Sequence, residues 1–216
     1  MMANYIASAT LLFCAVISGQ TTLVVAADTN CSKIVTVVIE TEKGKITVEL
    51  NPQLAPVTVA NFLRYVDKGY YTGGIFHRTV KMDNQPDKKI KIEVIQGGVN
   101  PQMEKKTFKP IKLETTQKTG IKHKDGVISM ARDKPNTATS DIFICIGDQP
   151  ELDFGGKRNP DGQGFGAFGH VTKGMDVVRL IQAAPSKEQK LTPAIKILKV
   201  VRDKSPISAK SLLPKS

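Results

Sequence analysis

The sequence predicts a mainly β fold, a closed β-barrel capped by two α-helices. Several short β-branched runs are separated by turn residues, which is typical of strands in one sheet. Two segments, one near each end of the barrel-forming region, have apolar residues at helical spacing. A chain of 216 residues with 40% hydrophobic residues is large enough for one good core. Closing the sheet removes its exposed edges, and each helix can bury its apolar face against the barrel.

The first elements are a hairpin and a helix. Residues 34–39 and 46–50 are β-branched runs joined by the polar turn 41–45, and Ile46, Val48 and Leu50 alternate toward one face. Pro56 suits the first turn of a helix. The residues that then recur at helical spacing are Val59, Phe62, Leu63, Val66 and Tyr70. Lys68 and Gly69 supply the signal that ends this helix.

The middle of the chain is predicted to hold more strands. Residues 75–80 form a short strand that carries Arg78. The turn cluster 83–87 and the lysine-alternating residues 89–95 predict a protruding hairpin with one solvent-facing side. Apolar runs at 126–131 and 141–146 predict two further strands, linked by a polar loop over residues 133–140.

The last elements are a long loop, a helix and a strand. Residues 147–166 are rich in Gly, Asn and Asp and predict a loop. Gly174 and Met175 open the second helix, whose expected buried face holds Val177, Leu180, Ile181 and Ala184. Residues 194–202 form the final strand, and residues 205–216 are expected to be a polar, flexible tail.

The first 27 residues contain no charged side chain, and small residues precede Asp28. This pattern predicts a secretory signal peptide cleaved near Ala27, and therefore an exported protein, periplasmic or secreted. The start of the segment lacks Lys and Arg, so an uncleaved hydrophobic anchor is the alternative. We expect a signal peptide at 1–27, one folded domain at 28–204 and the tail at 205–216. No further apolar run is long enough to span a membrane.

The net charge of +11 permits two interpretations. A basic protein can attract nucleic acid or an anionic envelope. The lysines are dispersed along the chain, however, and no basic run interleaves with aromatic residues. We therefore expect a solvated lysine coat and no specific nucleic-acid partner.

The sequence predicts no metal site and no cofactor. Cys31 and Cys145 fit no metal-binding spacing; a disulfide between them is permitted but cannot be inferred, and Cys145 fits a buried strand position. His123 and His170 are expected in polar loops without partners at metal spacing. Residues 157–168 do not fit a calcium loop, because Lys157 occupies the first ligand position.

Arg78 follows Phe76 and His77, and seventeen residues separate this motif from the Gln-Gly-Gly triplet that begins at Gln96. A permanently charged guanidinium and a neutral amide thus lie among apolar residues with no evident nucleophile. This combination suits a reaction that breaks no bond, such as rotation about a prolyl peptide bond, whose barrier is about 18–20 kcal/mol. Spacing alone leaves open that Arg78 is a structural arginine in an ion pair. His77 is interpreted as a packed strand histidine, because amide rotation needs no general base.

Short motifs in chain order form a specific set. They are Phe76-His77-Arg78, Gln96-Gly97-Gly98, Ser129-Met130-Ala131, Ser140 with Phe143-Ile144-Cys145, Leu152-Asp153, and Phe168-Gly169 with Gly174-Met175. Together they resemble the cyclophilins, the cyclosporin-type peptidyl-prolyl isomerases. The resemblance runs from about Val35 to Arg202. It implies an eight-stranded antiparallel barrel with a helix closing each end.

The resemblance also implies the roles of individual residues. Arg78 would match the catalytic arginine, and Gln96 the glutamine that positions it and the substrate. Phe143 and Leu152 would form the floor and wall of the proline pocket, with Val94 on its edge. Ala131 and Arg132 would lie where family members bind the substrate backbone. The remaining expected substrate-binding residues are Phe76, from the arginine motif, and Phe165, the nearest counterpart of the family's pocket histidine.

The chain departs from the family pattern at several places. The connection over residues 79–95 is longer than usual, and Glu93 falls nearest the place of a pocket phenylalanine. Asp141 replaces a usual glutamine, and Glu151 replaces an aromatic residue of the drug site. We therefore expect weak cyclosporin binding and turnover slower than in the typical enzyme.

These observations predict a peptidyl-prolyl cis–trans isomerase that accelerates proline-limited folding of exported proteins. Its partners would be proline-containing polypeptides, and we expect a monomer without a cofactor. The alternative is a non-catalytic proline-peptide-binding module or chaperone on the same barrel, which Glu93, Asp141 and Glu151 favour. A basic nucleic-acid-binding protein is the third and least favoured class.

Overall fold

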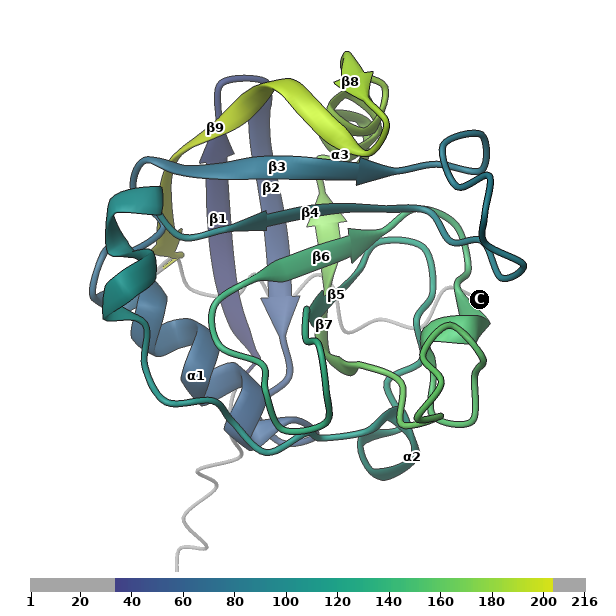
Figure 1. Cartoon of the computed structure of the whole chain (residues 1–216). Coiled ribbons are helices and arrows are strands. Elements are labelled where there is room, and N and C mark those ends of the chain that lie inside the picture. Colours follow the sequence, from purple (N-terminus) through teal and green to yellow (C-terminus); the bar gives the residue numbers. More distant parts are fainter. Residues whose placement is uncertain (1–33, 204–216) are drawn as a thin grey trace, which may run out of the picture. The chain divides into compact units, whose positions relative to one another are not determined.

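A computed structural model describes residues 34–203, and the predicted signal peptide and tail lie outside them. The strands form one antiparallel sheet in the order β1-β2-β7-β5-β6-β4-β3-β9-β8, and a further pairing of β1 with β9 closes eight of them into a barrel (Figure 1). Their bounds are β1 (Val35–Thr41), β2 (Gly44–Leu50), β3 (Gly74–Val80), β4 (Val94–Gly98), β5 (Val127–Met130), β6 (Ile142–Cys145), β7 (Gly166–Lys173), β8 (Ser186–Lys187) and β9 (Lys190–Arg202). The predicted closed barrel is thus confirmed, with β8 as a short extra partner of β9.

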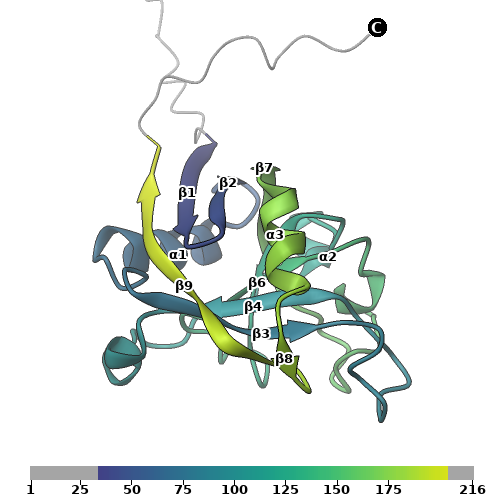
Figure 2. The ribbon, with the colours of Figure 1, turned by 90° about the horizontal axis from the view of Figure 1, so that it is seen from above.

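Two longer helices pack on the barrel, as predicted. Helix α1 (Pro56–Asp67) lies at the lower left of Figure 1 and α3 (Met175–Gln182) at its upper right, and the view from above separates them in the same way (Figure 2). Three short helical segments were not expected. These are the 3-10 helices η1 (Pro101–Lys106) and η2 (Pro150–Leu152), and the single-turn helix α2 (Thr116–Thr119).

Both helices use apolar faces, and the predicted face of α3 is correct for Ile181, Val177 and Ala184, which pack against the core, but wrong for Leu180. In α1 the predicted residues Val59, Phe62, Leu63 and Val66 are all buried. In α3 the buried side chains are Val178 and Ile181, whereas the side chain of Leu180 is 54% exposed. Helix α3 has only eight residues, so its apolar spacing left two neighbouring faces open.

The core fills the barrel, and α1 covers one side of it. Val37 and Ile39 of β1 and Ile46, Val48 and Leu50 of β2 are fully buried and alternate with less buried neighbours. The rings of Phe62 on α1 and Phe168 on β7 lie 5.3 Å apart and join the helix to the barrel. The inward alternation of the first hairpin was therefore predicted correctly.

The connection between β3 and β4 is a compact loop, not the expected hairpin. Residues 81–93 contain no strand, and β4 begins at Val94. The buried amide of Gln85 organises this loop: its Nε2 donates to the carbonyl oxygens of Lys81 (2.7 Å) and Ile92 (2.8 Å), and its Oε1 accepts from the Ile92 amide (3.3 Å). One side chain thus satisfies backbone groups that a hairpin would have paired with each other.

Two features of the C-terminal half were also missed. Strand β7 lies between β2 and β5, but its glycines weaken a strand pattern. Strand β9 begins at Lys190, four residues before the predicted start, and its first residues pair antiparallel with β8. Among residues 34–203, no helix is long and apolar enough to cross a membrane.

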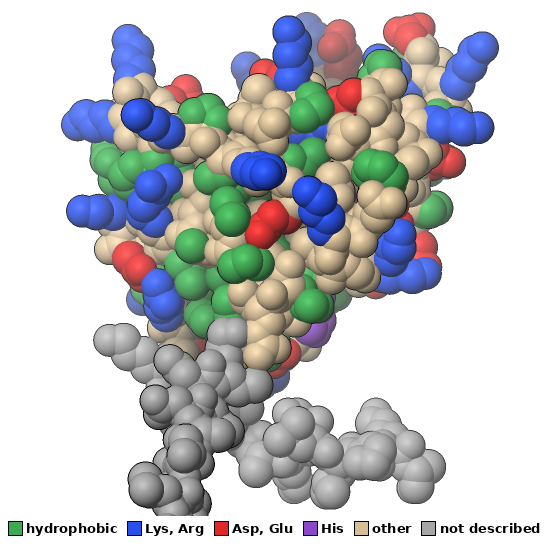
Figure 3. Space-filling model, turned by 90° about the horizontal axis from the view of Figure 1, so that it is seen from below, with side chains coloured by type: hydrophobic (Ala, Val, Ile, Leu, Met, Phe, Trp, Pro, Cys, Tyr) green, Lys and Arg blue, Asp and Glu red, His purple; other side chains and the backbone are tan. Residues whose placement is uncertain are grey.

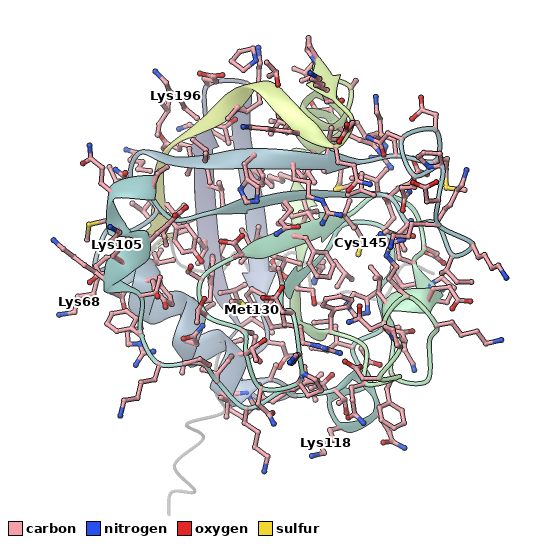
Figure 4. All side chains as sticks on the ribbon, in the orientation of Figure 1. Lys68, Lys105, Lys118, Met130, Cys145 and Lys196 are labelled. Carbon is pink, nitrogen blue, oxygen red and sulfur yellow. The ribbon has the colours of Figure 1, made fainter. Side chains whose placement is uncertain are left out.

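Basic side chains are spread over the described surface. Lys68 and Lys105 lie at the left of Figure 4, Lys196 at its upper left and Lys118 at its bottom, so the labelled lysines are not gathered in one patch. On the face seen in Figure 3, basic residues are separated by hydrophobic, acidic and other atoms. This arrangement agrees with the expected lysine coat.

Candidate active site

A cavity of about 580 Å³ brings together eight of the nine predicted site residues. They are Arg78, Val94, Gln96, Ala131, Arg132, Phe143, Leu152 and Phe165. Phe76 does not line this cavity: it is fully buried in the main core. Its inclusion among the substrate contacts is therefore corrected, because its ring packs inside the barrel beside Gly97 and cannot reach a bound peptide.

Three neighbouring strands place the central residues in one row. Arg78 on β3 is opposite Gln96 on β4, and Gln96 is opposite Phe143 on β6. Residues that are opposite one another in a sheet have side chains on the same face. Sheet register therefore sets the guanidinium, the amide and the aromatic ring side by side.

Two amide oxygens hold the Arg78 guanidinium. Its Nη1 donates to Oε1 of Gln96 (2.9 Å), while its Nε and Nη2 both donate to Oε1 of Gln189 (2.9 and 2.5 Å). Among residues 34–203, no carboxylate oxygen lies within 4.0 Å of this group, which argues against the structural ion pair left open above. Gln189 is in turn fixed because its Nε2 donates to the Asn84 carbonyl oxygen (3.2 Å).

The guanidinium is charged, partly buried and held by neutral groups. Burial lowers the pKa of Arg78 from its ordinary value, and repulsion by the nearby Arg158 lowers it further. Arginine side chains are effectively always protonated in proteins, so Arg78 carries its charge at neutral pH. Its positive charge is therefore available to a ligand in the cavity.

Gln96 connects Arg78 to Asp141. Nε2 of Gln96 donates to Oδ2 of Asp141 (3.3 Å), so the amide is oriented with its oxygen toward Arg78. Burial raises the pKa of Asp141, and the His77 side chain, whose Nε2 is 3.7 Å from Oδ2, opposes this increase. Asp141 thus acts here as the acceptor that sets the orientation of Gln96.

An apolar cluster forms the floor of the cavity. Its buried members are Val80, Ile92, Val94, Phe143, Cys145 and Leu152, with Ala131 and Phe165 packed against them. The rings of Phe143 and Phe165 meet edge to face with centroids 5.2 Å apart. Cys145 is fully buried as predicted, and burial raises the pKa of its thiol well above the ordinary value.

Ile92, not Glu93, lines the cavity beside Val94. The carboxylate of Glu93 accepts a hydrogen bond from Gln182 of α3 (3.1 Å), whereas Ile92 is 6% exposed and belongs to the apolar cluster. The expected acidic replacement inside the pocket is therefore wrong. Alternation along Ile92, Val94 and Gln96 is the signal that could have identified the correct residue.

His123 lies in a loop as predicted, but its side chain is buried beneath Phe143 and has polar partners, which was not expected. The imidazole is buried, with Nδ1 2.8 Å from Oδ1 of Asp153 and Nε2 3.1 Å from Oγ of Ser129. Its ring stacks on Phe143 with centroids 5.9 Å apart. Burial acts to raise the pKa of Asp153, but hydrogen bonds from His123 outweigh it and the pKa is lowered. This polar group supports the cavity floor from behind.

Arg132 is held in the cavity wall by its own contacts. Its terminal nitrogens donate to both carboxylate oxygens of Asp161 (2.8 Å each), and its Nε donates to the Gly164 carbonyl oxygen (2.8 Å). The guanidinium carbon lies 5.1 Å from the centroid of the Phe165 ring. Arg132 therefore fixes Phe165 against Phe143, and its charge is already paired.

Glu151 and His170 do not face the cavity. The Glu151 carboxylate accepts from the Lys157 amide (2.8 Å), and the exposed side chain of His170 belongs to β7 and not to the expected loop. Within the described part of the chain, no group of three or more His, Cys, Asp or Glu residues could hold a metal ion.

Comparisons with known proteins agree on one family. The model of the cyclophilin-type peptidyl-prolyl cis-trans isomerases matches residues 36–202. The chain is 38% identical over 149 residues to peptidyl-prolyl cis-trans isomerase cyp18 of Streptomyces antibioticus, covering 68% of this chain and 82% of that protein. It is 36% identical over 148 residues to peptidyl-prolyl cis-trans isomerase B of Escherichia coli, covering 68% and 83%.

A solved structure shows the same fold. The cyclophilin-type isomerase of Cryptosporidium parvum has a TM-score of 0.65 and 26% identity, covering 81% of this chain and all of that one. That protein was also crystallised in the presence of the dipeptide Ala-Pro.

Proposed function

The chain belongs to the cyclophilin-type peptidyl-prolyl cis–trans isomerases, and we propose that its Arg78, Gln96 and apolar cavity floor carry out the isomerisation. The alternative of a non-catalytic binding module is not favoured, because the curated relatives above are named as isomerases. The observation that carries the proposal is the guanidinium of Arg78, held by two neutral amides beside a hydrophobic cavity.

The arginine has donors left for a substrate. A guanidinium has five N–H groups. Gln189 accepts from the Nε hydrogen and from one hydrogen of Nη2, and Gln96 accepts from one hydrogen of Nη1. One N–H on each terminal nitrogen is therefore available to a peptide. These donors hold the carbonyl oxygen before proline and approach the proline nitrogen, whose lone pair is released as the amide twists.

The apolar floor receives the proline ring. Phe143, Leu152 and Phe165 offer a surface that excludes water, which strengthens the interaction of Arg78 with the twisted amide. Stabilising that transition state by about 7 kcal/mol corresponds to a rate gain of roughly 10⁵-fold. No nucleophile or proton transfer takes part, because rotation leaves every covalent bond intact.

The test of this mechanism is the exchange rate between cis and trans forms of a proline peptide, measured by NMR. We expect Arg78→Ala to lower kcat/KM by about 10²–10³-fold, the usual loss when one preorganised donor is removed. Arg179→Ala is the control, because Arg179 is an exposed arginine of α3 that pairs with Asp125 and does not line the cavity. Equal rates for wild type and Arg78→Ala would rule out the assigned mechanism.

We propose further that the substrates are prolines in unfolded or loop segments of exported proteins, and that the enzyme acts as a monomer. The charge-free residues 1–27 support export, and the family match at 36–202 supports a folded domain within 28–204. Expression of the full chain, followed by N-terminal sequencing of the mature protein, tests cleavage near Ala27. Light scattering of the purified protein tests the monomer.

A further inference from the structure

The charges that line the cavity are distributed unevenly. Its basic side chains are Arg78, Lys88, Arg132 and Arg158, and its acidic ones are Asp133 and Asp141. Arg132 is paired with Asp161, and Asp141 with Gln96 and His77. Arg78, Lys88 and Arg158 have no carboxylate oxygen within 4.0 Å among residues 34–203.

Two of these unpaired basic residues, Lys88 and Arg158, lie at one end of the cavity. This end lies where the loop of residues 81–93 leads into β4. The first residue of β4 is Val94, which is opposite Cys145, the last residue of β6. Arg158 joins this end, because its Nη1 donates to Oε1 of Gln85 (3.0 Å) and to the Ile90 carbonyl oxygen (2.6 Å). Lys88 lies between these two anchor points in the sequence and also lines the cavity.

The acidic residues belong to the other end. Asp141 directly precedes β6, whose first residue Ile142 is opposite both Gly97 of β4 and Met130 of β5. Asp133 is three residues after Met130, the last residue of β5, so it lies at the same end of the sheet as Asp141. A peptide in this cavity therefore meets a basic end and an acidic end, with Arg78 and Gln96 between them.

Three unpaired positive charges around one cavity are unfavourable without an anion. Arg78 and Arg158 repel each other, which contributes to the lowered pKa of Arg78, and burial lowers the pKa of Arg158 as well. The Nη1 of Arg158 is used to anchor the loop, whereas no hydrogen bond from its Nε or Nη2 to a described residue is found. A negatively charged ligand group at this end would relieve the repulsion and use the remaining donors.

We propose that Arg158 and Lys88 form a subsite, next to Arg78, for an anionic side chain of the peptide, so that the enzyme prefers prolines flanked by an acidic residue. This inference rests on the proposed function and names the substrate class for the same site. The carrier of the charge is the carboxylate of Asp or Glu, or the phosphate of a modified serine, which offer the same chemistry to a guanidinium.

The test compares peptides that differ in one side chain. One pair has Glu or Gln directly before proline, and a second pair has Glu or Gln directly after it. We expect at least one pair to show a kcat/KM about fivefold or more higher for Glu at low ionic strength. The preference should shrink in 0.5 M NaCl, because salt screens charges beyond a few ångströms. A phosphoserine peptide in the preferred position shows which anion the subsite binds better.

Variants then assign the preference to named residues. Lys88→Gln and Arg158→Gln should each lower the Glu-to-Gln ratio of kcat/KM, and the double variant should bring it to about one. Lys89→Gln is the matched control, because Lys89 belongs to the same loop and does not line the cavity. Using the ratio cancels any effect that a variant has on both peptides alike, including partial loss of folded protein.

The possible results separate the two proposals. Equal kcat/KM for Glu and Gln in both pairs overturns the anion subsite and leaves the isomerase mechanism intact. A Glu preference that persists in the Lys88, Arg158 double variant also overturns the subsite. If wild-type protein isomerises neither the Gln nor the Glu peptides, the proposed function itself fails.

Discussion

Gln189 is the partner of Arg78 that motif analysis did not identify, and its removal tests whether the arginine must be held. It accepts hydrogen bonds from Nε and Nη2, at 2.9 and 2.5 Å, and lies 111 residues from Arg78 in the chain. Gln189→Leu removes Oε1, the acceptor of both hydrogen bonds, and keeps a side chain of similar size. The change leaves the positive charge of Arg78 in place and releases its orientation.

The expected loss follows from these contacts. Hydrogen bonds to a charged group contribute roughly 1.5–3 kcal/mol each, and misplacing a catalytic group by about 1 Å costs on the order of 10²-fold in rate. Gln96 still holds Nη1, so part of the orientation survives. We therefore expect kcat/KM to fall by about 10- to 100-fold. The loss should appear mainly in kcat, because Arg78 acts on the twisted amide more than on the bound ground state.

NMR supplies both assays for this variant. Exchange between the cis and trans forms of a proline peptide reports the rate. The Nε–H signal of Arg78 reports the hydrogen bond, and we expect its protection from exchange to be lost in Gln189→Leu. Gln189→Glu keeps an acceptor oxygen for Arg78 but places a negative charge against it. This variant should therefore retain protection of the Arg78 Nε–H from exchange. Its kcat should still fall, because the new carboxylate offsets the positive charge that Arg78 presents to the substrate.

Gln182→Leu is the matched control. Gln182 is another half-buried glutamine, which donates to Glu93 and does not line the cavity. Its loss should leave kcat near the wild-type value. The positioning role of Gln189 would be refuted if Gln189→Leu lost the Nε–H protection yet kept the wild-type kcat.

Two further predictions concern stability. Burial raises the pKa of Asp141, so the folded state disfavours its ionised carboxylate. The resulting loss of folding stability is complete above the folded-state pKa. It disappears as the pH falls below the unfolded-state pKa of about 3.9. Asp141→Asn should therefore increase the free energy of unfolding at pH 7 more than at pH 4 in urea titrations, and an equal gain at both would contradict this. His123→Leu removes a buried partner from both Asp153 and Ser129, so it should lower the free energy of unfolding by about 2–4 kcal/mol. Ser129→Ala removes one of these contacts and should lower it by about 1 kcal/mol. Equal urea midpoints for both variants and wild type would show that this buried network contributes nothing to stability.

Local periodicity predicted much of the barrel. The alternation in residues 46–50 placed Ile46, Val48 and Leu50 inward, and the helical spacing after Pro56 identified the buried face of α1. Both signals depend on neighbours in the sequence, which one chain displays directly. The buried face of α3 was predicted only in part, because eight residues make few turns and the apolar spacing fits two neighbouring faces. Strand β7 was missed because glycines replace the β-branched residues that mark a strand.

The central row of the site was predicted because each member lies in a short motif on a strand. Its supporting residues were not, because they act over long separations. Gln189 lies in a segment without apolar alternation, and it meets Arg78 only because β9, which begins at the next residue, pairs with β3. Lys122 and Lys124 flank His123 and suggested exposure, although His123 itself turns inward to Asp153. The alternating lysines in residues 89–95 predicted a hairpin. In the structure the side-chain amide of Gln85, and not a second strand, binds the backbone groups of this loop.

The seam between β1 and β9 has a consequence for the synthesis of the protein. Strand β1 is the first element described and β9 the last, and their pairing ends with the Asp203 amide donating to the Thr36 carbonyl oxygen (2.8 Å). A ribosome therefore finishes nearly the whole domain before the strand that completes the ring emerges. Until then β1 and β3 each lack a neighbour, so a nascent chain of this protein is itself exposed to edge-to-edge association and is a natural client for a chaperone.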